Sequence, residues 1–107
     1  MKREVVITGL GMVSPIGIGR EAFWNALDSG KSGIQEVPAL ASAKEVPIRL
    51  AGMFTDLDAK QYGQPRKAIK LMCREIQAAY AAAMIAMQDA SLAKEQVDPQ
   101  RLGVVLG

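Results

Sequence analysis

The sequence contains no histidine and only one cysteine among its 107 residues. The absence of histidine removes the commonest general base of enzymes and the commonest metal ligand. A single cysteine cannot form a disulfide bond within the chain, so we expect a reducing, cytoplasmic environment. The acidic residues are scattered and no two cysteines have metal-ligand spacing, so we expect neither a metal site nor a cofactor.

Charge and aromatic residues are also sparse, with a net charge of +2 and an aromatic content of 5%. This charge is too small to predict nucleic-acid binding, and aromatic residues do not alternate with basic ones. No apolar run reaches the roughly 20 residues that a membrane-spanning helix needs. The first residues carry no signal-peptide pattern. The composition is typical of a folded globular protein that binds neither nucleic acid nor membrane.

The segment Arg66–Asp89 is the most informative part of the sequence. Its apolar residues recur at intervals of three and four, the spacing of one helical face. Between Ala78 and Met87 no side chain is charged on any face. A helix that is apolar on all sides must be buried on all sides. We therefore predict a single core helix over Arg66–Asp89, with neighbouring elements packed around it.

The remaining segments predict an α/β fold. A β-branched run at Glu4–Leu10 and a second apolar run at Leu102–Leu106 are typical of buried strands. The apolar stripe in Arg20–Ser29 indicates an amphipathic helix, and Gly30 is placed to end it as the C′ residue. The resulting order of strand, helix, long connection, buried helix and strand is α/β organisation.

The connection over residues 31–64 is long for a compact domain, which is typical of a segment that serves a function or covers a partner. Its one strand-like piece is Pro47–Met53. The last predicted strand stands at the end of the sequence, beside a helix that lacks a polar face. We therefore expect residues 1–107 to be an interrupted domain, because so short a chain cannot cover that helix.

The glycine-rich turn that begins Gly9-Leu10-Gly11 invites comparison with a dinucleotide-binding loop. Such a loop follows the pattern G-x-G-x-x-G and opens a helix. Here the third glycine is missing, and Pro15 occupies the place where the helix should already run. We interpret the segment as a structural turn, with a small nucleotide-binding α/β module as the alternative.

Cys73 is the only candidate nucleophile. It lies inside the predicted helix, and the sequence offers no histidine to activate it. Reactive cysteines need an electropositive and partly exposed site. We therefore interpret Cys73 as a buried structural thiol and assign no catalytic residue.

Arg66, Lys67 and Lys70 form a basic cluster in the first turns of the predicted helix. Cations at a helix N-terminus oppose the helix dipole, at a cost of about 0.3–1 kcal/mol each. One interpretation of the cluster is a solvated charged face. The other is a binding site for an external anionic partner.

Five motifs that together span the chain occur in a specific order and spacing. They are VVITGLGMVSPIG (Val5–Gly17), FW..L..GKSGI (Phe23–Ile34), RLAG (Arg49–Gly52), MQDASL at the end of the long helix, and RLGVVLG (101–107). In this arrangement the chain resembles the N-terminal segment of the β-ketoacyl-acyl-carrier-protein synthases, above all the type II elongating synthase.

The resemblance implies a thiolase-like fold of five α/β/α/β/α layers, usually in a homodimer, with this chain as its N-terminal portion. It also implies a decarboxylative Claisen condensation in fatty-acid or polyketide synthesis. In such enzymes a cysteine takes the acyl chain from an acyl carrier protein, and two histidines assist. None of these catalytic residues aligns with this chain, Cys73 included. The family usually has glycine at the position of Ser91.

One site is carried over by the resemblance, and it is a contact with the carrier protein. The family uses a basic patch near the start of the long helix to bind the acidic acyl carrier protein. Arg66, Lys67 and Lys70 fall on those positions. A further alternative is a carrier-binding or partner subunit that performs no chemistry.

We expect the chain by itself to show no condensing or decarboxylating activity, because it cannot assemble a thiolate with two histidines. The measurement is carbon dioxide release from malonyl-carrier protein, which should stay at the uncatalysed rate. Release above that rate, equal in the Cys73→Ser variant, would reveal an unrecognised site and contradict the expectation.

Overall fold

The computed structural model describes residues 1–63 and 65–107, apart from the side chain of Lys94. The predicted long connection ends at residue 64, which lies outside the described residues. Most elements are short. In chain order they are β1 (Val13–Ser14), β2 (Gly17–Ile18), α1 (Arg20–Asp28), β3 (Ile34–Glu36), α2 (Pro38–Ala41), β4 (Leu50–Gly52), the 3-10 helix η1 (Ala59–Tyr62), α3 (Arg66–Leu71), α4 (Arg74–Asp89), and the 3-10 helices η2 (Lys94–Gln96) and η3 (Pro99–Arg101).

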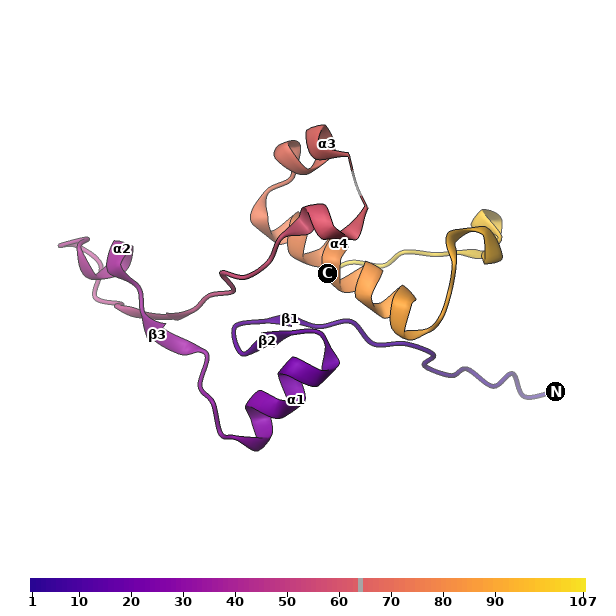
Figure 1. The fold of residues 1–107 in the computed structure, drawn as a ribbon, viewed down its shortest axis with the longest axis horizontal. Helices are drawn as coiled ribbons and strands as arrows, with labels where there is room; N and C mark the ends of the chain where they lie inside the picture. Colours follow the sequence, from indigo (N-terminus) through magenta and orange to yellow (C-terminus); the bar gives the residue numbers. More distant parts are fainter. Residues whose placement is uncertain (64) are drawn as a thin grey trace.

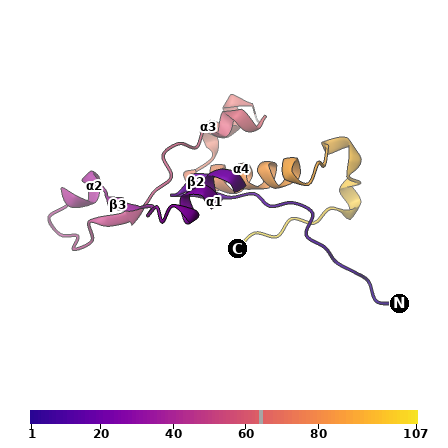
Figure 2. The same cartoon turned by 60° about the horizontal axis from the view of Figure 1, so that its bottom comes forward.

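Helix α4 lies near the centre of the molecule (Figure 1). The β1–β2 hairpin and α1 lie on one side of α4, and α3 projects on the other (Figure 1). The β3–β4 hairpin and α2 form an arm that extends away from α4 in both views (Figures 1 and 2). The α-carbon radius of gyration is 17.3 Å, against about 13 Å for a compact chain of this length. The chain is therefore elongated and has little interior.

The small interior corrects the prediction that the long helix is buried on all sides. Within α4 only Ala81 is buried, and Ile76 is 52% exposed. The elements that pack against α4 are β1, with the chain before it, and η1. They cover two faces of the helix and leave the remaining apolar surface open.

The prediction of one continuous helix over Arg66–Asp89 is also wrong, because Met72 and Cys73 have extended backbones and separate α3 from α4. The break allows α3 to turn and bury Ile69 beside η1. The Gln77 side chain then donates to the Met72 carbonyl and to the Ile69 carbonyl, which also accepts from the Met72 N–H. The helical spacing of apolar residues in the sequence cannot reveal a break in the helix that tertiary contacts stabilise in this way.

The two predicted buried strands are not formed within the described residues. Neither Glu4–Leu10 nor Leu102–Leu106 forms a helix, and neither pairs with another strand. Val5 is 92% exposed and Val105 is 96% exposed. A strand needs a hydrogen-bonded neighbour, and the apolar pattern of these segments does not supply one.

The strand predicted within Pro47–Met53 is confirmed in part as β4, which pairs antiparallel with β3. Ile34 lies opposite Gly52 and Glu36 lies opposite Leu50. The Val37 N–H extends the ladder with a 2.9 Å bond to the Arg49 carbonyl. Strand β3 was not predicted, because its three residues alternate too briefly to give a period.

The helix predicted over Arg20–Ser29 is confirmed as α1, and Gly30 ends it with a φ of 67°. The Gly30 N–H donates to the Leu27 carbonyl, and the Lys31 N–H donates to the Ala26 carbonyl. This pair of bonds is the Schellman motif.

Helix α4 ends in the same motif. The Ser91 N–H donates to the Gln88 carbonyl, and the Leu92 N–H donates to the Met87 carbonyl. Ser91 has a φ of 55°, a left-handed conformation that costs a residue with a side chain roughly 1–2 kcal/mol. Serine therefore strains the position where glycine would fit.

The glycines of the first turn lie directly on α4. A Cβ atom added at Gly11 would lie 1.9 Å from the Ala82 carbonyl oxygen, and one at Gly9 would lie 2.3 Å from that of Ala86. Alanines recur along this side of α4 at Ala82, Ala86 and Ala90, four residues apart. Residues spaced by four share one helical face. We call these three residues the alanine face of α4; it lets the two backbones approach without intervening side chains.

We expect Gly11→Ala to lower the free energy of unfolding by roughly 1–3 kcal/mol, because the new methyl group must push the chain away from α4. Thermal unfolding followed by circular dichroism measures the change. Gly103→Ala is the matched control, since nothing lies within 4 Å of its added Cβ. Equal losses in the two variants would show that the close contact does not stabilise the fold.

We expect Ser91→Gly to raise the free energy of unfolding by about 0.5–1 kcal/mol, because glycine removes the left-handed strain at a small cost in chain entropy. Ser91→Ala serves as the control: it removes the hydroxyl group but keeps the Cβ, so it should give no gain. A gain in Ser91→Ala as large as in Ser91→Gly would locate the effect in the hydroxyl group instead.

Candidate functional site

The basic cluster lies on α3, a helix of six residues. At about 100° per residue, Arg66, Lys67 and Lys70 fall within an arc of about 100° and so share one side of the helix. All three residues are exposed, and the first turn of α3 carries no acidic residue. The salt bridge that the described residues form joins Arg20 to Asp89 instead. We call the three cations the basic face of α3.

The helix boundary corrects part of the dipole argument. Because α3 ends at Leu71, Lys70 lies in its last turn, where the helix dipole favours a cation. Only Arg66 and Lys67 stand at the unfavourable end. The basic face is thus distinguished by its exposure and by the absence of a neutralising partner among the described residues rather than by the dipole alone.

Contacts from three residues of α4 hold α3 and the chain that leads to it. Gln77 Nε2 donates to the carbonyl groups of Ile69 and Met72, at 3.3 and 3.0 Å. The Tyr80 hydroxyl group donates to the Tyr62 carbonyl of η1 at 2.7 Å. Arg74, the third residue, contacts the chain before η1.

The guanidinium group of Arg74 donates to the Leu57 carbonyl at 3.1 Å and to the Phe54 carbonyl at 3.3 Å. It also lies over the Phe54 ring, 5.2 Å from the ring centre, in a cation–π contact. Arg74, Gln77 and Tyr80 are spaced by three, so we call them the polar face of α4. The sequence interpretation missed this face, although polar residues at helical spacing on an otherwise apolar helix are a readable signal.

Cys73 is exposed and precedes α4 as its N-cap residue, so its interpretation as a buried thiol is wrong. The helix break accounts for this change, because it removes Cys73 from the helix interior. The pKa of the Glu75 carboxyl group is lowered, because the carboxylate accepts hydrogen bonds from the Glu75 backbone N–H and from the Cys73 thiol. A carboxylate beside the sulfur does not supply the positive potential that activates a cysteine nucleophile.

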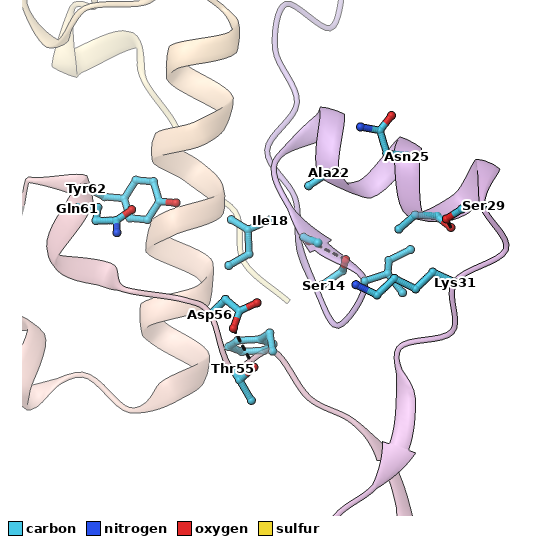
Figure 3. Close-up of a pocket in the computed structure, with 14 residues that line it drawn as sticks. Ser14, Ile18, Ala22, Asn25, Ser29, Lys31, Thr55, Asp56, Gln61 and Tyr62 are labelled. Carbon is cyan, nitrogen blue, oxygen red and sulfur yellow. Dashed lines mark hydrogen bonds between the residues drawn. The ribbon is translucent and has the colours of Figure 1, made fainter.

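A cleft with a volume of about 650 Å³ lies between the α1 side of the molecule and the chain that leads into η1. Figure 3 shows Ser14 and Lys31 on one wall and Asp56 and Tyr62 on the other. The Ser14 hydroxyl group donates to the Gly17 carbonyl at 2.8 Å, and Asp56 accepts from its neighbour Thr55. These polar groups are occupied by local turns, and they form no nucleophile and base pair.

The geometry also bears on the nucleotide-binding alternative. Gly9 and Gly11 face the backbone of α4, so they are not available to approach a phosphate group. The turn that follows them closes the β1–β2 hairpin at Pro15 and does not open a helix. The structural-turn interpretation agrees with this arrangement.

Comparison with protein families identifies the chain. The family model described as "Beta-ketoacyl synthase, N-terminal domain" matches residues 2–107. The chain belongs to the β-ketoacyl synthase family. The predicted fold class, the N-terminal part of a thiolase-like αβαβα fold, is confirmed by this match and by the structural similarity described next.

Several members of the family are similar over nearly the whole chain. The 3-oxoacyl-[acyl-carrier-protein] synthase 2 of Vibrio cholerae is 37% identical over 99% of this chain and 25% of its own length. The granaticin polyketide putative β-ketoacyl synthase 1 of Streptomyces violaceoruber is 36% identical over 100% of this chain and 25% of its own length. A solved structure, the ishigamide ketosynthase/chain length factor, aligns with a TM-score of 0.71 and 29% identity. That alignment covers 86% of this chain and 22% of the other.

The chain therefore spans about a quarter of the length of these relatives. Among the residues that the structure describes, no cluster of three or more potential metal ligands is present. No described helix combines the length and the hydrophobicity needed to cross a bilayer.

Proposed function

We propose that this chain is the N-terminal part of a ketosynthase domain, within a 3-oxoacyl-[acyl-carrier-protein] synthase of fatty-acid or polyketide synthesis. The complete enzyme would carry out a decarboxylative Claisen condensation in the cytoplasm as a homodimer. Family membership supports this proposal. The exposed Val5 and Val105 segments also support it, because further strands of a larger sheet would cover them.

The role proposed for this chain is to bind the acidic acyl carrier protein through Arg66, Lys67 and Lys70. The observation that carries the proposal is that three exposed cations share one side of a projecting helix whose first turn holds no acid. Relatives such as the Vibrio cholerae synthase carry an acyl carrier protein in their names, which supports an acyl carrier protein as the anionic partner. Charges at the rim of an interface mainly govern the encounter rate and its salt dependence.

A partner subunit that performs no chemistry is the second candidate. It is supported by the ketoacyl synthase β subunit of the tetracenomycin polyketide synthase of Streptomyces glaucescens, which is 38% identical over 94% of this chain and 24% of its own length. Carrier binding through the basic face is compatible with both candidates. A catalytic cysteine and two histidines elsewhere in the protein would separate them.

We expect reversal of Arg66, Lys67 and Lys70 to glutamate to raise the apparent KM for a carrier-bound substrate about fivefold or more in the synthase that contains this chain. Each exposed pair contributes about 0.2–1 kcal/mol, and each reversal adds repulsion. The increase should shrink at high ionic strength, where the Debye length falls below about 8 Å. Steady-state kinetics at two salt concentrations measure both effects.

The matched control reverses Lys2, Arg3 and Lys44, which are also exposed and change the net charge equally. This control should affect the carrier KM much less than the reversal on α3. Comparable effects of both triple variants would mean that net charge alone attracts the carrier. An unaltered carrier KM at low salt in the α3 variant would leave the basic face as a solvated surface.

A further inference from the structure

Helix α3 is too short to fix its own position. Isolated helices need about 12–15 residues before they are even marginally stable in water, and α3 has six. Its one buried side chain is Ile69. Its last residue, Leu71, is 89% exposed. The direction in which α3 points must therefore depend on contacts that neighbouring elements make with its backbone.

The amide group of Gln77 makes such a contact. Its Nε2 atom donates to the Ile69 carbonyl at 3.3 Å and to the Met72 carbonyl at 3.0 Å, at the C-terminal end of α3. A side chain that bonds the carbonyl groups at the C-terminal end of a helix acts as a cap. The Ile69 carbonyl also accepts from the Met72 N–H, so Gln77 is its second donor. Gln77 itself belongs to the first turns of α4, so this cap joins the two helices across the break.

The other end of the same amide group is fixed as well. Gln77 Oε1 accepts a 3.4 Å bond from Arg74, which holds the carbonyl groups of Phe54 and Leu57. Two carbonyl acceptors on one side and a guanidinium donor on the other determine the orientation of the amide. The amide thus connects the end of α3, the start of α4 and the chain before η1.

We propose that Gln77 is a positioning residue for carrier binding, which holds the basic face of α3 in the direction that the acidic carrier protein meets. This inference rests on the proposed function. Gln77 does not touch the partner; it acts through α3. Without its two bonds, α3 would still carry all three cations but would present them in many orientations, and binding would lose the benefit of a preformed site.

The test uses Gln77→Met in the synthase that contains this chain, because methionine keeps the length of the side chain and loses both donors. Gln88→Met is the matched control on the same helix, since Gln88 is exposed and its side chain makes no hydrogen bond among the described residues. We expect Gln77→Met to raise the carrier KM about threefold to tenfold at low salt. The KM for a small thioester that needs no carrier should rise less.

Two further readouts separate positioning from a general loss of stability. Hydrogen exchange of the backbone amides of Arg66–Leu71 should accelerate in Gln77→Met relative to those in the middle of α4. In a double-mutant cycle, reversal of the three cations should raise the carrier KM less in Gln77→Met than in the wild type, because the cations no longer act from a fixed position.

The possible results distinguish this inference from the function on which it rests. If the triple reversal raises the carrier KM but Gln77→Met does not, the positioning role is overturned and carrier binding by the basic face stands. If carrier and small-thioester KM values rise equally, or the two sets of substitutions are additive, the role is likewise overturned. If the triple reversal itself has no effect on the carrier KM, the proposed function and this inference both fail.

Discussion

The close contact between the Gly9–Gly11 chain and α4 is the constraint on which the rest of the structure depends. It requires small residues on both sides, since any side chain at Gly11 would collide with the carbonyl of Ala82. Asp89 reinforces the contact by accepting a 3.0 Å bond from the Leu10 N–H and by pairing with Arg20 of α1 at 3.1 Å. The N-terminal chain, the hairpin that follows it and α1 are thereby fixed to one side of α4.

The other side of α4 holds the chain before it. At about 100° per residue, the centre of the polar face of α4 lies roughly opposite the centre of its alanine face. Arg74, Gln77 and Tyr80 hold the segments that lead to α3 and cap the end of α3 itself. One helix thus packs by backbone contact on one side and by specific hydrogen bonds on the other. The first arrangement provides close packing, and the second gives an irregular segment a defined path.

The sequence predicted the features that local chemistry determines. The apolar stripe and Gly30 located α1 and its end, because the C′ position requires a left-handed conformation that glycine adopts freely. Family motifs identified the fold class. The break at Met72–Cys73 was missed, because contacts between separate segments stabilise it, such as the bond from Gln77 to the Ile69 carbonyl eight residues earlier. Cys73 was assigned to the interior for the same reason.

Strands were predicted less well than helices, because their stability depends on a partner strand. Glu4–Leu10 has the composition of a buried strand, yet it pairs with no strand within the described chain, and Val5, Val6 and Ile7 stay exposed. The three residues of β3 show no clear period, yet they pair with β4 because the Val37–Arg49 bond and the register Ile34–Gly52 continue one ladder. The sequence of one strand alone does not reveal which distant segment it pairs with.

The central claim is that α3, held by α4, presents its cations to an acidic carrier protein. Leu71, 89% exposed at the end of α3, is a suitable place for a photoreactive phenylalanine analogue in the synthase that contains this chain. The same analogue in place of Ile48, which is 61% exposed and lies just before β4, provides the comparison. The account predicts a cross-link to the carrier protein from position 71 that high salt suppresses, and little from position 48. Equal capture at the two positions, or capture at 71 that does not depend on salt, would contradict it.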